Sequence, residues 1–393
     1  MLFDPFSEEF IADPFPAYRA LREQGPVCYH EPTGTWLVGR YEDVKRLLRD
    51  HRLVAAHRGG SLSAPGAPPG LQESLDQLLA GCPTVRPEQA DRSMKLVRHA
   101  FSAPQVAALR SRWERVAEEL VDGLVRAGGG DLMAGVTRPL ALTVMSDLIG
   151  VPRDDRERVG RWASLITACF GIGPQVDTAL AVSTSAEFTD YMLELVAHRR
   201  TAPENDLLSA LADAERGGGL PDQEIASAAA MLLVFSVTCP NLSNAIGFLT
   251  LHRHPDQWAL LRRKPELMPT AVQELLRFDA SVHKFDRTAR EDIAVGDARI
   301  ARGAQVGILF ASANHDPARF TEPDRLDINR SPNPHLAFGA GRHHCPGAHL
   351  ASVQMSAVYS ALIRKAPNCR VIAEPQWDDA AGIRGPRELS VAA

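Results

Sequence analysis

The sequence has few cysteines and no pattern that would pair them. Six cysteines occur in 393 residues, and none belongs to a CxxC pair. That number is too small for a disulfide scaffold, and the spacing does not supply the two separated ligand pairs of a closed zinc site. We therefore expect reduced, mostly buried thiols at five of the six positions.

The chain also lacks an excess of positive charge and an obvious secretory or membrane-spanning segment. Its formal net charge is −5 and its isoelectric point is near 6.2, so no basic field would hold nucleic acid or an anionic membrane. The N-terminus is acidic and broken by prolines, unlike a signal peptide, and no run reaches the roughly 18 apolar residues that span a bilayer. The sequence predicts a cytoplasmic protein with no nucleic-acid partner and no membrane partner.

Hydrophobic periodicity predicts a mainly α protein with a minor β region, built as a single domain over residues 1–393. Short apolar runs around turn residues predict strands near 26–40, 280–310 and 370–393. Helical spacing dominates from about 87 to 215, and the longest predicted helix runs from Pro221 to His254. Residues 58–86 are rich in Gly, Pro and Ser, which is typical of a lid or binding loop.

The segment with the clearest chemistry surrounds Cys345, in the run Phe-Gly-Ala-Gly-Arg-His-His-Cys-Pro-Gly from Phe338 to Gly347. The glycines at 339 and 341 allow a tight backbone and close approach to a flat group. Cys345 precedes a proline that favours a helix start, and a helix N-terminus stabilises a thiolate. Three interpretations remain open: a buried structural thiol, a zinc site that uses the nearby histidines, or axial ligation of a haem iron.

This run resembles the haem-binding signature of the cytochrome P-450 superfamily, the haem-thiolate monooxygenases. Three other segments resemble the family in the right order: Glu274-Leu-Leu-Arg277, the strand around Arg287, and the proline-punctuated coil that contains Arg325. The resemblance covers essentially the whole chain and is closest to the soluble bacterial type. It implies the single-domain cytochrome P-450 fold.

The resemblance also implies a cofactor, partners and residue roles. The cofactor would be haem b, with Cys345 as the axial iron ligand, and the protein would be a monomer that takes electrons from ferredoxin and ferredoxin reductase to activate dioxygen. A structural network would join Glu274, Arg277 and Arg325. The remaining haem contacts would come from the cysteine loop and from two cationic positions, namely Phe338, Gly339, Gly347, His343 and Arg287.

The chain departs from the family at the second haem-propionate clamp. Typical members carry His-x-x-x-Arg before an Ala-Phe-Ser motif, but here those places hold Ala90 and Met94. The nearest cations are Arg92 and Lys95. We expect Arg92 to contact the haem in place of the missing pair.

A second departure lies in the longest helix, where the family usually places an acid–alcohol pair that relays protons. Thr238 occupies the acid position, Cys239 the alcohol position, and Pro240 follows, while no carboxylate occurs between Glu224 and Asp256. Thr238 and Cys239 are therefore the candidate catalytic residues, with protons supplied through ordered water or by the substrate. The proline removes one backbone donor, which predicts a kink or an opening of the helix.

The missing acid leads to our main functional expectation. Family members that join aromatic rings in peptides or cyclic dipeptides often lack the usual pair, so we expect oxidative coupling of an aromatic, indole- or phenol-bearing substrate. The alternatives are hydroxylation or epoxidation of a small natural product, peroxide-driven turnover, and a haem protein without turnover. The expected pocket wall combines aliphatic, aromatic and polar side chains, with His283 and Asp286 as candidates to orient a substrate: Val234, Phe235, Val282, His283, Phe285 and Ile383.

Overall fold

The structure is a computed structural model, which describes residues 4, 5, 7–55, 97, 98, 101–169, 177–213, 221–380 and 382–393. The chain divides into two compact units. The first comprises Met1–His57, Leu242–Cys345 and Asn368–Ala392, and the second comprises Arg58–Asn241, Pro346–Pro367 and Ala393. The prediction of one domain stays a prediction, whereas the mainly helical content with minor β regions is confirmed.

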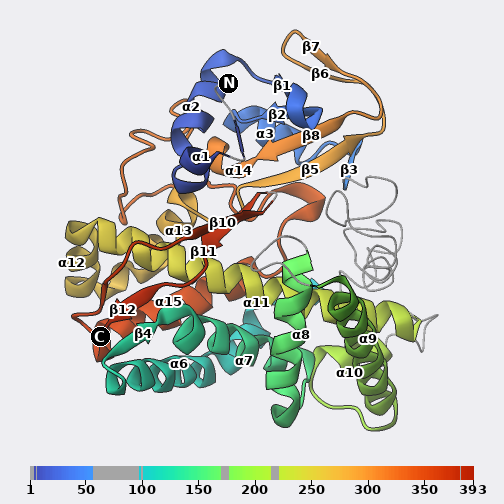
Figure 1. The fold of residues 1–393 in the computed structure, drawn as a ribbon, viewed down its shortest axis with the longest axis vertical. Coiled ribbons are helices and arrows are strands. Elements are labelled where there is room, and N and C mark those ends of the chain that lie inside the picture. The colour runs from blue at the N-terminus through green and yellow to red at the C-terminus, as the bar shows by residue number, and fades with distance from the viewer. Residues whose placement is uncertain are drawn as a thin grey trace. The chain divides into compact units, whose positions relative to one another are not determined.

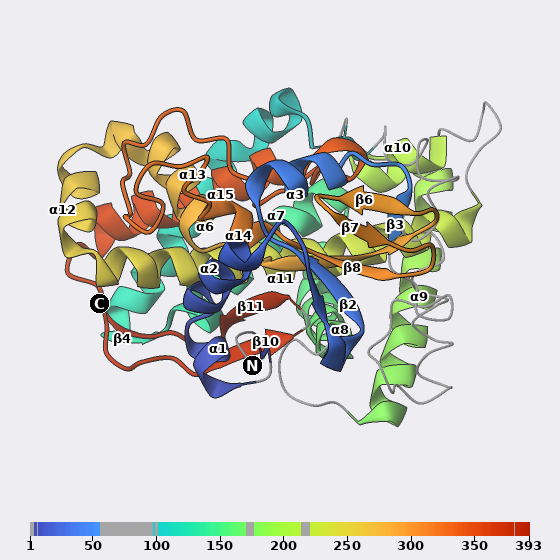
Figure 2. The same cartoon turned by 90° about the horizontal axis from the view of Figure 1, so that it is seen from above.

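The first unit contains a five-stranded sheet with the order β1-β2-β8-β5-β3. Its strands are β1 (Cys28–His30), β2 (Thr35–Val38), β8 (Gln305–Leu309), β5 (Lys284–Ala289) and β3 (Leu53–Ala55). The first two form an antiparallel hairpin, and β2 and β8 run parallel and side by side (Figure 2). β5 is antiparallel to both of its neighbours, β8 and β3. Three smaller antiparallel pairings occur as predicted near 280–310 and 370–393: β6 (Ile293–Val295) with β7 (Ala298–Ile300), β10 (Trp377–Ala380) with β11 (Ile383–Pro386), and β9 (Arg370–Val371) with β12 (Ser390–Ala392).

Short helices accompany this sheet, and apolar residues from both form one buried core. The core includes Val44 and Leu47 from helix α3, Val306 and Ile308 from β8, and Phe310. Burial of such side chains contributes about 1.5–3 kcal/mol each, so the core fixes the strand that carries Arg287. The helices wholly within this unit are α1 (Glu8–Ala12), α2 (Phe15–Gln24), α3 (Tyr41–Leu47), α12 (Pro255–Arg263), α13 (Met268–Phe278) and α14 (Phe310–Asn314).

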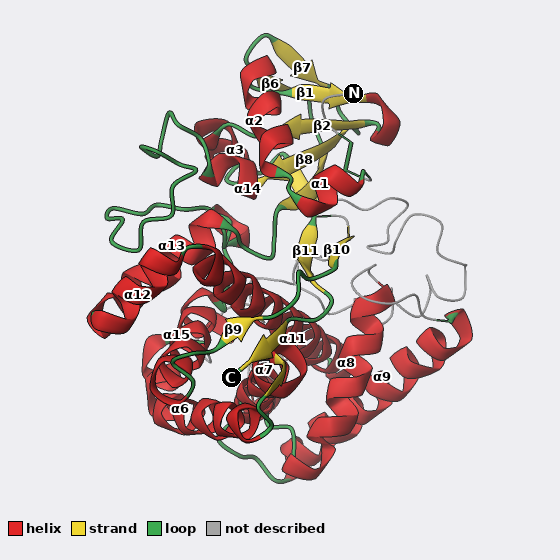
Figure 3. Cartoon of the chain, turned by 60° about the vertical axis from the view of Figure 1, so that its left-hand side comes forward, coloured by secondary structure: helices red, strands yellow, loops and turns green. Residues whose placement is uncertain are grey.

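The second unit is a helical bundle. Helices α6 (Ala103–Arg126) and α15 (Ala348–Lys365) lie side by side in it (Figures 1 and 3). Trp113 of α6 is completely buried and donates its indole N–H to Asp147 of α7, which also accepts hydrogen bonds from Arg112 and from Arg156 of α8. One carboxylate thus ties three helices together. The other elements are β4 (Gly129–Asp131), α7 (Arg138–Ile149), α8 (Arg156–Cys169), α9 (Thr178–Thr201) and α10 (Leu207–Asp213).

The longest helix, α11 (Asp222–Arg253), confirms the prediction of one long helix from 221 to 254. It is long and apolar enough to cross a membrane, but 72% of its most apolar window is buried within the protein, as expected of a core helix. The helix continues through Pro240, so the chain does not open there. The boundary between the two units falls inside it, after Asn241.

Candidate active site

The loop that ends at Cys345 is folded back on itself in the first unit. The Cys345 amide donates to the Phe338 carbonyl at 2.9 Å, and the Gly339 amide donates to Leu336 at 2.8 Å. Gly339 and Gly341 have φ values of +70° and +72°, a region that favours glycine. A Cβ atom at Gly341 would lie 2.9 Å from the backbone oxygen of Leu48. Backbone conformation therefore favours glycine at both positions, and close packing adds a second requirement at Gly341.

Cys345 itself is half-buried. Of the other described cysteines, Cys369 is buried as expected, whereas Cys28 and Cys239 are half-buried. The described cysteines 28, 239, 345 and 369 form no disulfide. In the described part of the chain, no group of three or more His, Cys, Asp or Glu side chains gathers as a metal site. His344 and His349 are exposed, so the zinc interpretation finds no ligand set there. A haem iron needs a single thiolate, which this loop supplies. Gly347 caps the N-terminus of α15.

The side chains of Arg287 and His343 lie close enough to influence each other. Among the described residues no carboxylate forms an ion pair with Arg287, whose guanidinium donates to the carbonyl of Asp286 at 2.9 Å. Burial lowers the pKa of Arg287. Burial, followed by the neighbouring Arg287 and Arg342, lowers the pKa of His343 to about 4. A partly buried arginine beside the cysteine loop, with no carboxylate ion pair in the described part of the chain, fits a group with negative charge, as the propionates of a haem have.

Phe285 and Arg287 occupy alternate positions of β5 and therefore point to the same side of the sheet. The Phe285 ring is 42% exposed, although most large apolar side chains of the protein are buried. The Arg287 guanidinium lies 5.8 Å from its ring centre. This face presents an aromatic ring next to a cation, an arrangement suited to an apolar ligand with an acidic edge.

The polar candidates near β5 already have partners. His283 is 2% exposed, and its two ring nitrogens lie 3.2 Å from the Tyr18 hydroxyl and 3.0 Å from Asp279. Asp286 pairs with Lys284 at 3.0 Å. Both groups are engaged in contacts within the protein, and the expectation that His283 or Asp286 orients a substrate stays a prediction.

The two apolar candidates in this unit, Val282 and Ile383, are paired through an isolated β-bridge. Ile383 is 9% exposed, while Val282 is partly buried against the sheet core. The bridge fixes β11 against the start of β5, and the His283 amide strengthens it by donating to Gly382 at 2.7 Å.

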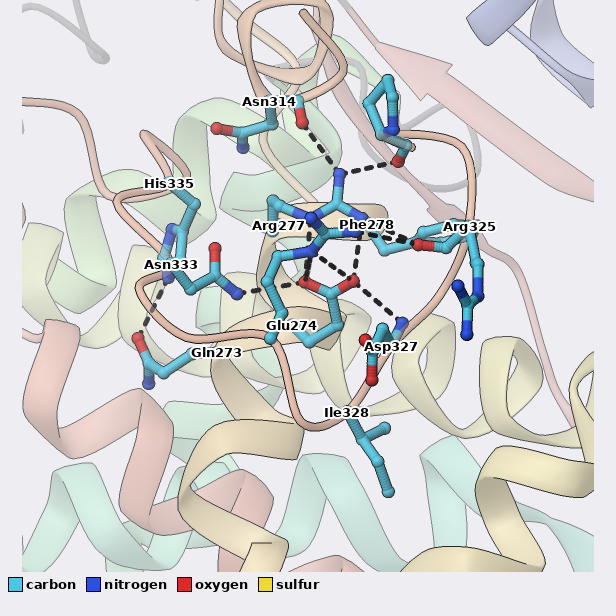
Figure 4. A network of polar contacts seen from close by, with 12 residues as sticks. Gln273, Glu274, Arg277, Phe278, Asn314, Arg325, Asp327, Ile328, Asn333 and His335 are labelled. Atoms are coloured by element: carbon cyan, nitrogen blue, oxygen red, sulfur yellow. Dashed lines mark hydrogen bonds and ion pairs between the residues drawn. The ribbon is translucent and has the colours of Figure 1, made fainter. Parts of the chain in front are cut away.

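Glu274 and Arg277 form a completely buried ion pair on α13, as their spacing predicts (Figure 4). The guanidinium donates to both carboxylate oxygens, at 2.8 and 2.9 Å. Arg277 also donates to the carbonyls of Asn314 and Pro323. The carboxylate further accepts from the Asp327 amide and from Asn333. Such complete hydrogen bonding is what offsets the cost of burying two charges.

The second arginine of this network is Arg330, not Arg325 as the sequence suggested. The Arg330 Nε atom lies 3.1 Å from both Glu274 oxygens, and its side chain is 13% exposed. The Arg325 side chain is 62% exposed and pairs with Glu322 instead. Arg325 contributes its carbonyl oxygen to Arg277 at 3.4 Å. The path of the coil from 321 to 333 directs Arg330 toward Glu274. Hydrophobic periodicity cannot predict the side-chain directions of such a coil.

The middle of α11 in the second unit carries the remaining candidates. Val234 is buried, whereas Phe235, Thr238 and Cys239 are half-buried. The Thr238 hydroxyl donates to the Val234 carbonyl at 2.9 Å and lies 2.9 Å from the hydroxyl of Thr167 on α8. Nothing in the sequence distinguishes Thr167, because a lone threonine on an amphipathic helix belongs to no motif.

Two predicted features lie outside the described residues. Arg92 and the Gly/Pro/Ser-rich stretch 58–86 belong to the part of the chain that the structure does not describe.

Comparisons with known proteins show which family the chain resembles. The family model described as Cytochrome P450 matches residues 252–366, which include the Glu274 network and Cys345. Nocardicin C N-oxygenase of Nocardia uniformis subsp. tsuyamanensis is 35% identical over 98% of this chain and 97% of its own length. Mycinamicin IV hydroxylase/epoxidase of Micromonospora griseorubida is 35% identical over 95% of this chain and 94% of its own. The crystal structure of CalO2 matches with a TM-score of 0.90 and 30% identity, covering 99% of this chain and 98% of that one. The chain therefore belongs to the cytochrome P450 family of haem-dependent monooxygenases.

Proposed function

We propose that this protein inserts one oxygen atom from dioxygen into a small natural product of bacterial secondary metabolism, by hydroxylation, epoxidation or N-oxygenation. The observation that carries the proposal is full-length similarity at 35% identity to an N-oxygenase and to a hydroxylase/epoxidase. Electrons come from a redox partner, for which we propose a ferredoxin with its reductase. We propose a cytoplasmic location.

The residues that would hold the haem are those of the cysteine loop, which includes His343, and Arg287. Cys345 would ligate the iron, and Phe338 would pack near its sulfur, with Gly339 and Gly347 shaping the backbone on either side. Arg287 and His343 would hold the propionates, a role supported by the lack of a carboxylate partner for Arg287 among the described residues. When bound, the haem supplies dioxygen activation. Arg92 remains a proposed contact from the sequence alone.

In the first unit, apolar and aromatic groups on β5 and β11 would contact the substrate. Phe285 supports this assignment because its ring is exposed on the same strand face as Arg287. Val282 and Ile383 are the other candidates in that unit, and Val234 and Phe235 of α11 are the candidates in the second unit. His283 would hold the wall in place through Tyr18 and Asp279.

Thr238 would handle protons in the absence of an acid on α11. No carboxylate occurs in this helix between Glu224 and Arg253. A hydroxyl can accept one proton while it donates another, so Thr238 can pass protons between water and the reacting oxygen without a change in its own charge. Cys239 is the neighbouring candidate.

Oxidative coupling of an aromatic substrate is the second candidate, and the missing acid on α11 is the observation that favours it. The similarity to oxygen-inserting relatives supports monooxygenation better. In a coupling reaction the substrate's own N–H or O–H hydrogens would be removed, and no oxygen would enter the product.

Incubation with ¹⁸O-labelled dioxygen distinguishes the two. The purified haem-loaded protein, a ferredoxin system and NADH would be mixed with a small-metabolite extract of the source organism, and the C345S variant would serve as the control. Gain of one ¹⁸O atom in a product that the control does not form supports monooxygenation. Loss of two hydrogens without label would overturn it in favour of coupling.

A further inference from the structure

The hydroxyl groups of Thr167 and Thr238 form a pair inside the second unit. Their oxygens are 2.9 Å apart, although the residues lie 71 positions apart on α8 and α11. Thr167 is 6% exposed and Thr238 is half-buried. The contact links the proposed proton-handling residue to a helix that the family signature does not mark.

Each hydroxyl also faces a carbonyl of its own helix. Thr167 lies 2.7 Å from the Ala163 oxygen, and Thr238 lies 2.9 Å from the Val234 oxygen. A hydroxyl has one proton to donate and two lone pairs that accept. The pair therefore has two protons for three contacts that each need one.

Three arrangements satisfy two of the three contacts. If each hydroxyl donates to the carbonyl of its own helix, the two oxygens face each other at 2.9 Å without a proton between them. The other two arrangements place a proton between the oxygens. In one, Thr167 donates to Thr238, and Thr238 donates to Val234. In the other, Thr238 donates to Thr167, and Thr167 donates to Ala163. Because the number of hydrogen bonds is equal, the pair can exchange arrangements at small cost. Without Thr167, the Thr238 hydroxyl would continue to donate its hydrogen bond to the Val234 carbonyl.

We propose that Thr167 is a positioning residue that enables Thr238 to relay protons. The inference rests on the proposed function, in which Thr238 handles protons for oxygen reduction. Thr238 releases its hydroxyl proton toward the reacting oxygen and accepts the proton of Thr167, and Thr167 regains a proton from water. No charge accumulates on either residue, so a carboxylate on α11 is not required.

Four variants test the pair. T167V removes the hydroxyl with little change in shape, T167S restores it, and T238V removes the partner. T189V is the matched control, because Thr189 is a half-buried threonine of α9 whose hydroxyl donates to the Ser185 carbonyl four residues earlier at 2.8 Å. It shares the chemistry of Thr167 but has no threonine partner across helices in the described contacts.

The first readout is stability, which does not depend on turnover. Urea unfolding of the four haem-loaded variants and the T167V/T238V double variant gives a double-mutant cycle. If the two residues were independent, the fold-change in the unfolding equilibrium constant of the double variant would equal the product of the two single fold-changes. We expect it to differ from this product by about 2- to 12-fold, the range to which the net free energy of one hydrogen bond converts. The T189V/T238V double variant serves as the control cycle. Effects of T167V and T238V that multiply as independently as those of T189V and T238V would overturn the hydrogen bond.

The second readout is NADH-driven dioxygen consumption with the ferredoxin system, without added substrate, in H₂O and in D₂O. T167V should slow consumption about 2- to 12-fold and change the solvent isotope effect, as T238V does, while T167S and T189V behave like the unaltered protein. An unchanged rate and isotope effect in T167V would overturn the proposal. If T167V slows consumption while the labelled-dioxygen experiment shows no oxygen insertion, the pair is supported and the proposed product is wrong.

Discussion

Replacing Arg330 with glutamine should destabilise the protein far more than the same change at Arg325. Arg330 contacts both oxygens of the buried Glu274 carboxylate and donates to the carbonyls of Thr321, Glu322 and Arg325. The R330Q variant leaves these acceptors with fewer donors inside a network in which Glu274 is completely buried.

The magnitude follows from what remains after the change. Glu274 keeps its two hydrogen bonds from Arg277 and those from Asp327 and Asn333, so the carboxylate is not left uncompensated. A hydrogen bond to a charged group contributes about 1.5–3 kcal/mol, and we expect R330Q to cost about this much. R325Q removes an exposed pair with Glu322, which contributes about 0–1 kcal/mol.

Urea unfolding of the haem-loaded protein, followed by the loss of the haem absorption band, measures both variants under one condition. The free energy of unfolding should fall for R330Q and stay close to that of the unaltered protein for R325Q. An equal loss in the two variants, or a larger loss for R325Q, would refute the assignment of Arg330. R330K is a useful third variant, because it keeps the charge but not the planar group with its several donors.

Three further predictions concern the cysteine loop and its surroundings. C345S should abolish the thiolate-ligated ferrous–CO spectrum, and an unchanged spectrum would contradict the ligand assignment. G341A should lower haem retention and stability more than G303A, measured by haem release and unfolding. Both glycines have positive φ (+72° and +85°), which costs about 1–2 kcal/mol in alanine, but only at Gly341 does the new Cβ meet backbone within 4 Å; equal effects would show that packing against Leu48 is unimportant. Burial lowers the pKa of His335 from its ordinary 6.5 to about 4, so its contribution to stability is complete above pH 6.5 and is lost as the pH falls toward 4. H335Q should therefore flatten the decrease in unfolding free energy between pH 7 and pH 5 by about 2 kcal/mol at most, and an unchanged slope would be evidence against the buried neutral ring.

Features that depend on residues close in sequence could be predicted well. The long apolar pattern between Asp222 and Arg253 gave the bounds of α11 to within a residue. The Glu274–Arg277 pair followed from helical spacing, because residues three apart share a face. The glycines of the cysteine loop indicated a backbone with positive φ, which glycine adopts at no steric cost.

Features that depend on the path of a segment without regular secondary structure could not be predicted from the sequence. Arg325 and Arg330 lie in the same coil, and neither periodicity nor spacing tells which one turns inward. His283 is a polar candidate beside β5, yet the hydroxyl of Tyr18, 265 residues earlier, forms a hydrogen bond with one of its ring nitrogens. In both cases the interacting residue belongs to an element far away in the sequence, which the local pattern does not indicate.

Proton handling on α11 also depends on a partner residue from another element. The sequence establishes that the helix has no carboxylate near Thr238, and this absence first favoured a reaction in which the substrate supplies the protons. The structure adds a second hydroxyl from α8, within 2.9 Å of Thr238. A pair of hydroxyls can exchange protons as a neutral relay, whereas an isolated threonine bonded to its own helix has its one proton engaged. With the relay that we propose, oxygen insertion would not require the missing acid, and the variants of Thr167 and Thr238 test this directly.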